Sequence, residues 1–286
     1  MSFITLTTDF GTKDHFVGAV KGAIFSELPE VNIIDITHEI SPFNITETAY
    51  ILKNSYKSFP KGTVHIVGVD SELSAENKHI ALELDDHFFV CPDNGLISMI
   101  ASEVKPKKIV EINIHDRIES SFPVLDVFVQ VACFIIRGGN LTVIGKEIED
   151  FKKIIEIQPK TNQQQDQIIG GVLYIDNYGN VITNINKKMF QDIGKGRNFT
   201  INAKKHKFTK IFSKYNEVAS NSAYSNQQYE GHKLALFNSA AYLELAIYRS
   251  NLDTVGGASS LLGLEYRDVV TITFENKPNQ EFTILN

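Results

Sequence analysis

The sequence contains no tryptophan and only two cysteines in 286 residues. Cys91 and Cys133 both lie in apolar stretches, which predicts buried free thiols and not a disulfide. Neither has a second cysteine at the CxxC spacing, so a thiolate zinc site is excluded. The eight histidines are scattered, without an HExxH motif or paired ligand spacing. We therefore expect neither a metal ion nor a cofactor.

Long runs of one residue type are also missing. No stretch approaches the roughly 18 apolar residues that span a membrane. With a formal net charge of −6, no run of lysine or arginine is long enough to follow a phosphate backbone. The chain starts with a strand pattern and shows no signal-peptide pattern. These observations predict a cytoplasmic protein that binds neither membranes nor nucleic acid.

Phosphate-binding motifs are absent as well. The sequence has no GxGxxG and no Walker motif, which argues against a dinucleotide or nucleoside triphosphate cradle. Asp9-Phe10-Gly11 is similar to the magnesium motif of protein kinases, but it stands at the start of the chain with no His-Arg-Asp loop before it. A kinase is therefore not indicated.

The first half of the chain alternates between strand and helix patterns. Strand patterns begin near residues 4, 31, 64, 79, 87 and 108, and helical patterns near 14, 45, 96 and 124. Hydrophobic residues make up 43% of the chain, enough for a sizeable core. This order predicts an α/β domain with a mostly parallel sheet.

The composition changes at about 149–167, which is rich in Lys, Glu and Gln. Beyond it the chain is almost entirely short strand patterns separated by Gly and Asn turns, which predicts an all-β barrel domain. The expected strands are 171–175, 181–185, 199–203, 207–212, 233–237, 242–248, 269–274 and 282–285. We place the α/β domain at 1–155, a linker at 156–168 and the barrel at 169–286.

Polar clusters follow three of the expected strands. Asp9 and Asp70 come where strands end in the α/β domain, and ligands of open α/β sheets bind in the crevice beyond those ends. A structural role as a turn or helix cap is the alternative for Asp9. The third cluster, Asp176 to Asn180, is also the pattern of a tight hairpin. His65, within an apolar strand, is interpreted as a core histidine.

The ordered set of motifs resembles the S-adenosylmethionine hydroxide adenosyltransferase family, relatives of the fluorinase and chlorinase enzymes, over nearly the full chain. The motifs are Thr-Thr-Asp-Phe-Gly-Thr-Lys-Asp at 7–14, Asp-Ile-Thr-His-Glu-Ile-Ser-Pro-Phe at 35–43, Phe-Pro-Lys-Gly-Thr-Val-His at 59–65, Pro-Asp-Asn-Gly-Leu at 92–96, Asp-Asn-Tyr-Gly-Asn-Val-Ile-Thr-Asn-Ile at 176–185 and Asn-Ser-Ala-Ala-Tyr-Leu-Glu at 238–244.

The resemblance implies a homotrimer with a small adenosyl ligand between the first domain of one subunit and the second domain of its neighbour. Asp9 would accept the ribose hydroxyls, because a carboxylate suits a cis-diol. Asp176 and Asn180 would hold the methionine ammonium group. The other ligand-binding residues implied are Phe43 and Phe122 around the ribose and sulfonium, Ser239 near the carboxylate, Ile247 to Arg249 around the adenine, and Phe10 and Asn77.

The residues of the family pattern that hold and activate the attacking water are altered in this sequence. Asp70 matches an aspartate that helps to hold water, but Asn77 and Pro123 stand where the family has arginine and histidine. Neither residue supplies the fixed positive fork of arginine or the base of histidine. A carboxylate pair of Asp70 with Glu72 is one hypothetical substitute. Lys78 and His79, close by in sequence, are others, although each is more often a plain surface or strand residue.

The resemblance and the altered residues lead to two functional hypotheses, an enzyme and a binding protein. The first is an enzyme that binds S-adenosylmethionine and lets water, oriented by Asp70, displace methionine from C5′ to give adenosine. The second is an adenosyl-ligand binding protein with impaired catalysis, which the residues at 77 and 123 favour. Halide transfer is a weaker third hypothesis, because the altered 70–77 loop gives no reason to expect a halide pocket.

Overall fold

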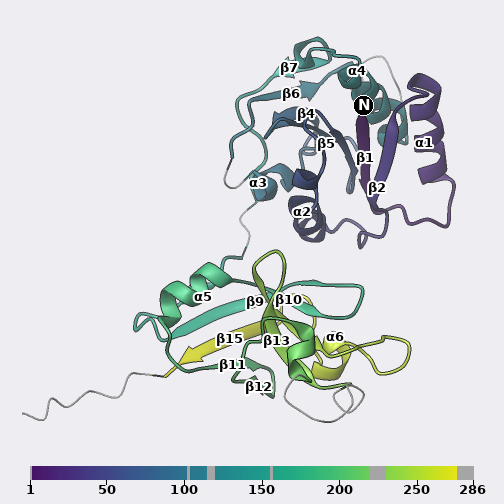
Figure 1. The fold of residues 1–286 in the computed structure, drawn as a ribbon. Coiled ribbons are helices and arrows are strands. Elements are labelled where there is room, and N and C mark those ends of the chain that lie inside the picture. The colour runs from purple at the N-terminus through teal and green to yellow at the C-terminus, as the bar shows by residue number, and fades with distance from the viewer. Residues whose placement is uncertain (1, 102–103, 115–119, 155–156, 220–229, 276–286) are drawn as a thin grey trace, which may run out of the picture. The chain divides into compact units, whose positions relative to one another are not determined.

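A computed structural model describes residues 2–101, 104–114, 120–154, 157–219 and 230–275. The chain divides into two compact units, residues 1–156 and 157–286, and each is described by itself. Figure 1 shows a mixed sheet between helices in the first unit and a curled sheet of antiparallel strands in the second.

The N-terminal unit is built on a seven-stranded sheet in the order β2-β1-β3-β5-β4-β6-β7. The pairs β1–β2, β1–β3 and β3–β5 are parallel, whereas β4 and its neighbours, together with β6–β7, are antiparallel. The strands are β1 (Phe3–Thr8), β2 (Asn32–Thr37), β3 (Val64–Gly68), β4 (His79–Leu84), β5 (His87–Pro92), β6 (Lys108–Ile112) and β7 (Gly145–Glu147). The expected α/β fold is confirmed, with a mixed sheet whose parallel strands come first.

Helices cover both faces of this sheet, so the unit has three layers (Figure 1). On one face α1 (Phe16–Glu27) and α4 (Val129–Ile136) pack against β1, β3 and β5. On the other, α2 (Ile45–Lys53) and α3 (Leu96–Ile100) pack against β3, β4 and β5. Short helical turns complete the unit: η1 (Tyr56–Ser58), the π-helix η3 (Val124–Phe128) and η4 (Leu141–Val143).

Local sequence explains where these helices begin. Asn44 caps α2 by accepting a hydrogen bond from the Glu47 backbone N–H, and Glu47 lies in the first turn, where its charge suits the helix dipole. In α1 the buried residues Val20 and Ile24 are one turn apart, the spacing of a single apolar stripe. This stripe packs α1 onto the sheet.

The C-terminal unit is an antiparallel, barrel-like sheet in the order β12-β11-β15-β9-β10-β14-β13, with β8 beside β9. Its strands are β8 (Lys160–Thr161), β9 (Gln167–Ile175), β10 (Val181–Asn186), β11 (Phe199–Ala203), β12 (His206–Phe208), β13 (Lys233–Phe237), β14 (Tyr242–Ile247) and β15 (Val269–Phe274). A bridge between Phe212 and Leu236 brings the chain after β12 alongside β13 and so draws the two sheet edges together. The expected strand at 282–285 lies outside the described residues.

The C-terminal unit also has helices that the sequence interpretation missed. These are α5 (Lys187–Gly194), η5 (Tyr215–Val218) and α6 (Ala258–Leu262). Asn186 caps α5 by accepting from the Met189 backbone N–H, directly after β10 ends. The expected linker, 156–168, contains β8 and the first residues of β9. Lys160 and Thr161 form β8 by pairing with β9.

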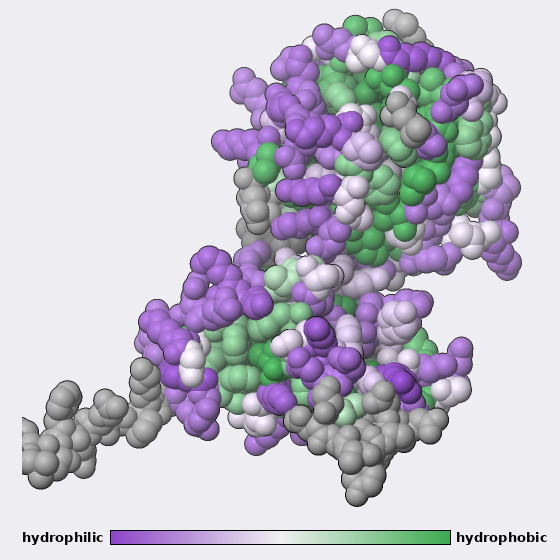
Figure 2. Space-filling view, in the orientation of Figure 1, coloured by the Kyte–Doolittle hydropathy of each residue, from purple (hydrophilic) through white to green (hydrophobic). Residues whose placement is uncertain are grey.

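The surface of the N-terminal unit is not uniformly polar, since hydrophobic residues reach it on the face in view (Figure 2). Among the helices of the described segments, none combines the length and apolarity that crossing a membrane requires. Cys91 and Cys133 are both buried and free, as predicted, and burial raises the pKa of each thiol. His65 is completely buried in β3, which confirms its interpretation as a core histidine.

Candidate functional site

Asp9 and Asp70 follow the ends of two neighbouring parallel strands. The last paired residues of β1 and β3 are Thr8 and Gly68, so the two aspartates lie at the same edge of the sheet. Both side chains are partly exposed. This edge is where a ligand crevice forms in an open α/β sheet.

Asp9 does not cap α1, whose N-cap is His15 and whose cap has no side-chain hydrogen bond. Its Oδ2 instead accepts the backbone N–H of Phe43 at 3.0 Å, from the loop after β2. Phe43 has a positive φ of 62° and is 71% exposed. A bulky residue with positive φ is strained, and such strain persists where surrounding contacts hold it. The Asp9 carboxylate supplies one of those contacts.

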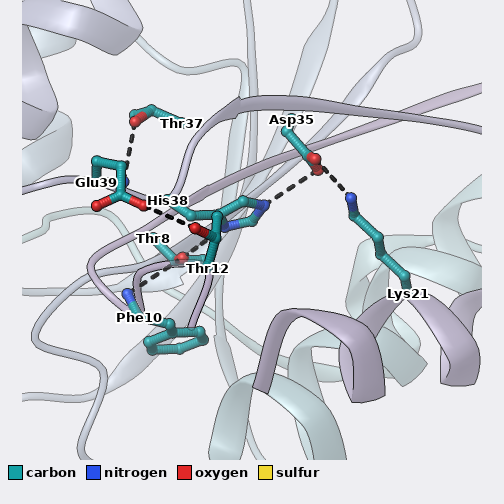
Figure 3. Close-up of polar contacts among 8 residues, drawn as sticks. All are labelled: Thr8, Phe10, Thr12, Lys21, Asp35, Thr37, His38 and Glu39. Carbon is teal, nitrogen blue, oxygen red and sulfur yellow. Dashed lines mark hydrogen bonds and ion pairs between the residues drawn. The ribbon is translucent and has the colours of Figure 1, made fainter. Parts of the chain in front are cut away.

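A polar network links the end of β1 to β2, the loop after β2 and α1 (Figure 3). His38 is buried, with Nδ1 2.7 Å from the Thr8 hydroxyl and Nε2 3.1 Å from Asp35. Asp35 also pairs with Lys21 of α1 at 2.5 Å. Burial alone would raise the pKa of Asp35, but hydrogen bonds from Lys21 and His38 outweigh it and hold the pKa below its ordinary value.

The Thr8–His38–Asp35 order has the appearance of a nucleophilic triad, but it is built for support. Thr8 is 2% exposed, and its hydroxyl also accepts the Phe10 backbone N–H at 3.4 Å. The Gly11 N–H donates to the His38 carbonyl at 2.8 Å. The network therefore ties the loop that carries Asp9 to the loop after β2, and offers no nucleophile to a substrate.

Three aromatic side chains gather beside Asp9. Phe10 and Phe122 meet edge to face with centroids 5.4 Å apart, and Phe16 lies 5.3 Å from Phe122. Gly68 permits this approach, because a Cβ there would lie 3.1 Å from the Phe10 ring and 2.8 Å from Val124. The group forms an apolar wall next to the two aspartates. Phe43, also expected near the ribose and sulfonium, lies in the loop after β2 with its side chain exposed.

Asn77, the residue in the position of the family arginine, is used inside its own loop. Its Nδ2 donates to the backbone carbonyls of Asp70 at 2.8 Å and Glu72 at 3.0 Å. Asn94 donates to the carbonyl of Val69 at 3.1 Å, just before Asp70. These contacts hold Asp70 at a positive φ of 49°. Glu72 is exposed and enters the network through its backbone carbonyl, so its carboxylate gains no defined role here.

The structure also places Pro123 and the two other hypothetical substitutes, His79 and Lys78. His79 is completely buried, its Nε2 is 2.9 Å from the Ser71 carbonyl, and its ring packs edge-on against Phe128. It supports the loop after β3. Pro123 is the N-cap of the π-helix η3. Lys78 is exposed, and its carbonyl accepts from Asp93.

In the C-terminal unit, Asp176 and Asn180 form the predicted hairpin and at the same time a polar cluster. Asp176 Oδ1 accepts the backbone N–H groups of Tyr178 at 2.9 Å and Asn180 at 2.8 Å, while Oδ2 accepts Asn180 Nδ2 at 2.9 Å. Asn180 is 4% exposed, and among the described residues its Oδ1 has no hydrogen-bond donor. A buried acceptor without a donor is costly unless a ligand supplies one.

Glu244 joins this cluster, although the sequence interpretation gave it no role. It pairs with Ile182 across β10–β14, so it shares the sheet face of Asn180, opposite the barrel core. Glu244 is 3% exposed. Burial and the nearby charge of Asp176 raise its pKa, against hydrogen bonds from Tyr215 and Asn238 that lower it. The sequence signal was a lone acid within an apolar strand.

The remaining predicted residues lie around β14. Ser239 is exposed in the turn between β13 and β14. Ile247 is 4% exposed with its side chain in the barrel core, so only its backbone is presented outward. Arg249 has a positive φ of 54° and pairs with Glu230 at 2.8 Å. Each unit thus carries its own group of candidate residues.

The described residues include no cluster of three or more His, Cys, Asp or Glu side chains arranged to hold a metal ion. The groups instead offer carboxylates, an amide oxygen and aromatic faces, a set that suits an organic ligand with hydroxyls and a positive charge.

Comparison with known proteins identifies the family of this chain. Residues 4–145 match the SAM hydroxide adenosyltransferase N-terminal domain, and residues 170–271 match the C-terminal domain of the same family. An (R)-S-adenosyl-L-methionine hydrolase of Methanocaldococcus jannaschii is 33% identical, covering 96% of this chain and 97% of its own length. A fluorinase of an Actinoplanes species is 22% identical over 68% of this chain and 74% of its own.

Solved structures show the same architecture. The crystal structure of an uncharacterized conserved protein from Thermotoga maritima superposes with a TM-score of 0.79 at 28% identity, covering 96% of this chain and 100% of that one. A conserved hypothetical protein from Thermus thermophilus, at 23% identity and a TM-score of 0.70, shares the fold. With both domains matched in order along one chain, this protein belongs to the SAM hydroxide adenosyltransferase family.

Proposed function

We propose that this protein binds S-adenosylmethionine and hydrolyses it to adenosine and methionine. A water oxygen forms a bond to C5′ of the ribose while the bond from C5′ to sulfur breaks. The bonding electrons go to sulfur, which leaves as the neutral thioether of methionine, and the attacking water releases its proton to the solvent. The substrate is itself a cation, so the leaving group needs no protonation.

The observation that carries this proposal is the Asp9 carboxylate at the carboxyl end of β1, beside the aromatic wall of Phe10 and Phe122. Oδ2 accepts from the Phe43 backbone, which holds the carboxylate in one orientation. A carboxylate has about four lone-pair sites, so a ribose diol can donate to those that remain. The relatives named as S-adenosylmethionine hydrolases support this choice of ligand.

The cluster of the C-terminal unit suits the other end of the ligand. Asp176 and Glu244 are acidic side chains, and Asn180 Oδ1 is a buried acceptor in need of a donor. An ammonium group has three donors and a positive charge, which match this set. We propose that the two groups of residues complete one site between subunits of a homotrimer. The homotrimer and a cytoplasmic location remain predictions.

For the chemical step we propose that Asp70 accepts a hydrogen bond from the attacking water and orients it toward C5′. Positioning alone is worth several kcal/mol in such reactions, of the order of 7–11 in the best cases. The apolar wall excludes other water from the reacting atoms. This site would therefore depend on orientation, since Asn77 is bound to its own loop and Pro123 has no titratable group.

A binding protein with impaired catalysis is the second candidate, and the same two residues favour it. Asn77 and Pro123 leave Asp70 without the partners that the family pattern places around the water. In this case S-adenosylmethionine would bind with both of its ends held, and C5′ would stay intact.

Product analysis separates the two candidates. Purified protein is incubated with S-adenosylmethionine, and adenosine and methionine are quantified by liquid chromatography, with binding measured by calorimetry. The hydrolase predicts equal amounts of both products, loss of turnover in Asp70→Ala, and retained turnover in Glu76→Ala, an exposed acid of the same loop. Binding without products selects the second candidate, whereas no binding of any adenosyl compound would refute both.

A further inference from the structure

Glu244 lies on the outer face of the barrel-like sheet, beneath a segment that comes from elsewhere in the chain. Its neighbours on that face of β14 are Ala246 and the adjoining Tyr248, whereas Leu243 and Leu245 point into the barrel core. A glutamate on a sheet's outer face is ordinarily solvated, yet this one is 3% exposed. Something on the outer face therefore covers it.

The cover is the segment 212–219, which contains η5. The Phe212 backbone N–H donates to the Ala235 carbonyl at 2.8 Å, and Val218 and Ala219 pack in a small apolar cluster with residues of β13 and β14. This packing fixes the segment independently of any contact to Glu244. From it, the Tyr215 hydroxyl donates to Glu244 Oε1 at 2.5 Å.

The groups that face Glu244 act on its charge in opposite directions. Asp176, from the β9–β10 turn, opposes ionisation, and so does burial. Tyr215 and Asn238, from η5 and the β13–β14 turn, stabilise the carboxylate by hydrogen bonding. The strand residues paired with Glu244, Ile182 and Leu236, are apolar. Two neutral donors thus counter part of the desolvation of one buried acid, whose pKa stays above its ordinary value.

We propose that Tyr215 is a positioning residue: its hydroxyl holds the Glu244 carboxylate ionised and aimed along the face it shares with Asp176 and Asn180, so that the cluster recognises a primary ammonium group. The ligand part of this inference rests on the proposed function. The part that concerns Glu244 itself rests only on the contacts within the C-terminal unit.

A purely structural role for Tyr215 predicts something different. If the hydroxyl only fastened the segment 212–219, its removal would lower stability and leave the titration of Glu244 unchanged. Because Phe212, Val218 and Ala219 anchor the segment separately, Tyr215→Phe should fold, and its melting temperature reports any loosening.

The test is Tyr215→Phe in the full-length protein, with Tyr266→Phe as a matched control, because the two tyrosines are 42% and 40% exposed. Glutamate side-chain carboxyl carbons are labelled with ¹³C and titrated by NMR, and Glu244→Gln identifies the Glu244 signal. We expect Glu244 to titrate about one pH unit higher in Tyr215→Phe than in the wild type, as loss of one charge-assisted hydrogen bond implies. Tyr266→Phe should match the wild type.

A second arm measures the affinity for S-adenosylmethionine from pH 5 to 8. The acidic limb of the affinity profile should move to higher pH in Tyr215→Phe by the same amount as the NMR titration. Coincident NMR titrations of Tyr215→Phe and the wild type would overturn the inference whatever the ligand. A shifted NMR titration without binding of S-adenosylmethionine by the wild type would instead refute the proposed function and leave the role of Tyr215 supported.

Discussion

Phe43 donates its backbone N–H to Asp9 Oδ2 over 3.0 Å, although the two residues are 34 positions apart. The bond joins the loop after β1 to the loop after β2 and holds a strained backbone at Phe43. Asp9 therefore has a structural acceptor role and, in the proposed function, a ligand role.

Asp9→Asn separates the two roles of this residue. The amide oxygen can still accept from Phe43, but the charge that favours the ribose diol is lost. We expect adenosine affinity to fall about 10- to 100-fold, the range for a hydrogen bond to a charged group. The melting temperature should remain close to that of the wild type.

Calorimetry with adenosine measures the effect, and Asp14→Asn, which removes an exposed acid of the same loop, is the control. Asp9→Ala should in addition lower the melting temperature, because the Phe43 N–H then loses its acceptor. Undiminished adenosine affinity in Asp9→Asn would contradict the ribose role.

His38→Ala tests the polar network that links the end of β1 to β2, the loop after β2 and α1. The substitution removes the partner that Thr8 and Asp35 share; Asp35 keeps Lys21, whereas the buried Thr8 hydroxyl keeps only its 3.4 Å contact to the Phe10 N–H. Loss of its hydrogen bond by a buried polar group costs about 1–3 kcal/mol. Urea unfolding should show a loss of this size. Adenosine affinity should also fall, because the loop that carries Asp9 is no longer held.

The control is Glu39→Ala, an exposed neighbour for which we expect a change within about 0.5 kcal/mol. Equal stability of the His38 and Glu39 variants would mean that the network does not stabilise the fold.

Gly179→Ala tests how tightly the C-terminal cluster is built. Gly179 has a φ of +74°, and a Cβ there would lie 2.9 Å from Gly257 Cα and 2.7 Å from Leu252. Gly196 has nearly the same φ, +75°, but nothing within 4 Å of a Cβ. Alanine at either position therefore costs about 1–2 kcal/mol for its backbone conformation.

Only Gly179→Ala adds a collision with backbone. Chemical denaturation should show a larger loss of stability for Gly179→Ala than for Gly196→Ala, and only the former should weaken ligand binding through Asp176 and Asn180. Equal losses in the two variants would show that the turn adapts to the added carbon.

Two buried histidines make stability depend on pH. His65 and His87 lie with ring nitrogens 3.1 Å apart, and burial lowers the pKa of both, that of His65 from 6.5 to about 3. The unfolded chain takes up these protons below pH 6.5 while the folded protein does not. For His65 this contribution to stability is complete above pH 6.5 and is lost as the pH falls toward 3, by up to about 1.4 kcal/mol per pH unit, and the lowered pKa of His87 adds to the loss in the same direction.

Urea unfolding between pH 7.5 and 4 measures this slope. His65→Gln should be less stable at neutral pH but should show a shallower decline on acidification. His232→Gln, at an exposed histidine, should decline as the wild type does. A slope unchanged by His65→Gln would assign the acid sensitivity to other groups.

The local pattern of the sequence determined most of the elements and where the candidate residues stand along them. Alternation in β1 and the helical spacing of Val20 and Ile24 predict the first strand and helix, because each depends on the period of a single element. Asp9 and Asp70 could be assigned to strand ends for the same reason. The short helices α5 and α6 were missed, since a turn or two of helix carries too little periodicity to stand out among strands.

Tertiary structure alone decided which polar groups have partners. Asn77 turns back onto the carbonyls of Asp70 and Glu72, and Glu244 is covered by a segment that begins some thirty residues earlier. Hydrogen-bond partners and burial depend on packing between distant segments, which no local period encodes. The sequence therefore determined the family and the candidate residues, whereas the fold decided which of those residues support the site and which remain open to a ligand.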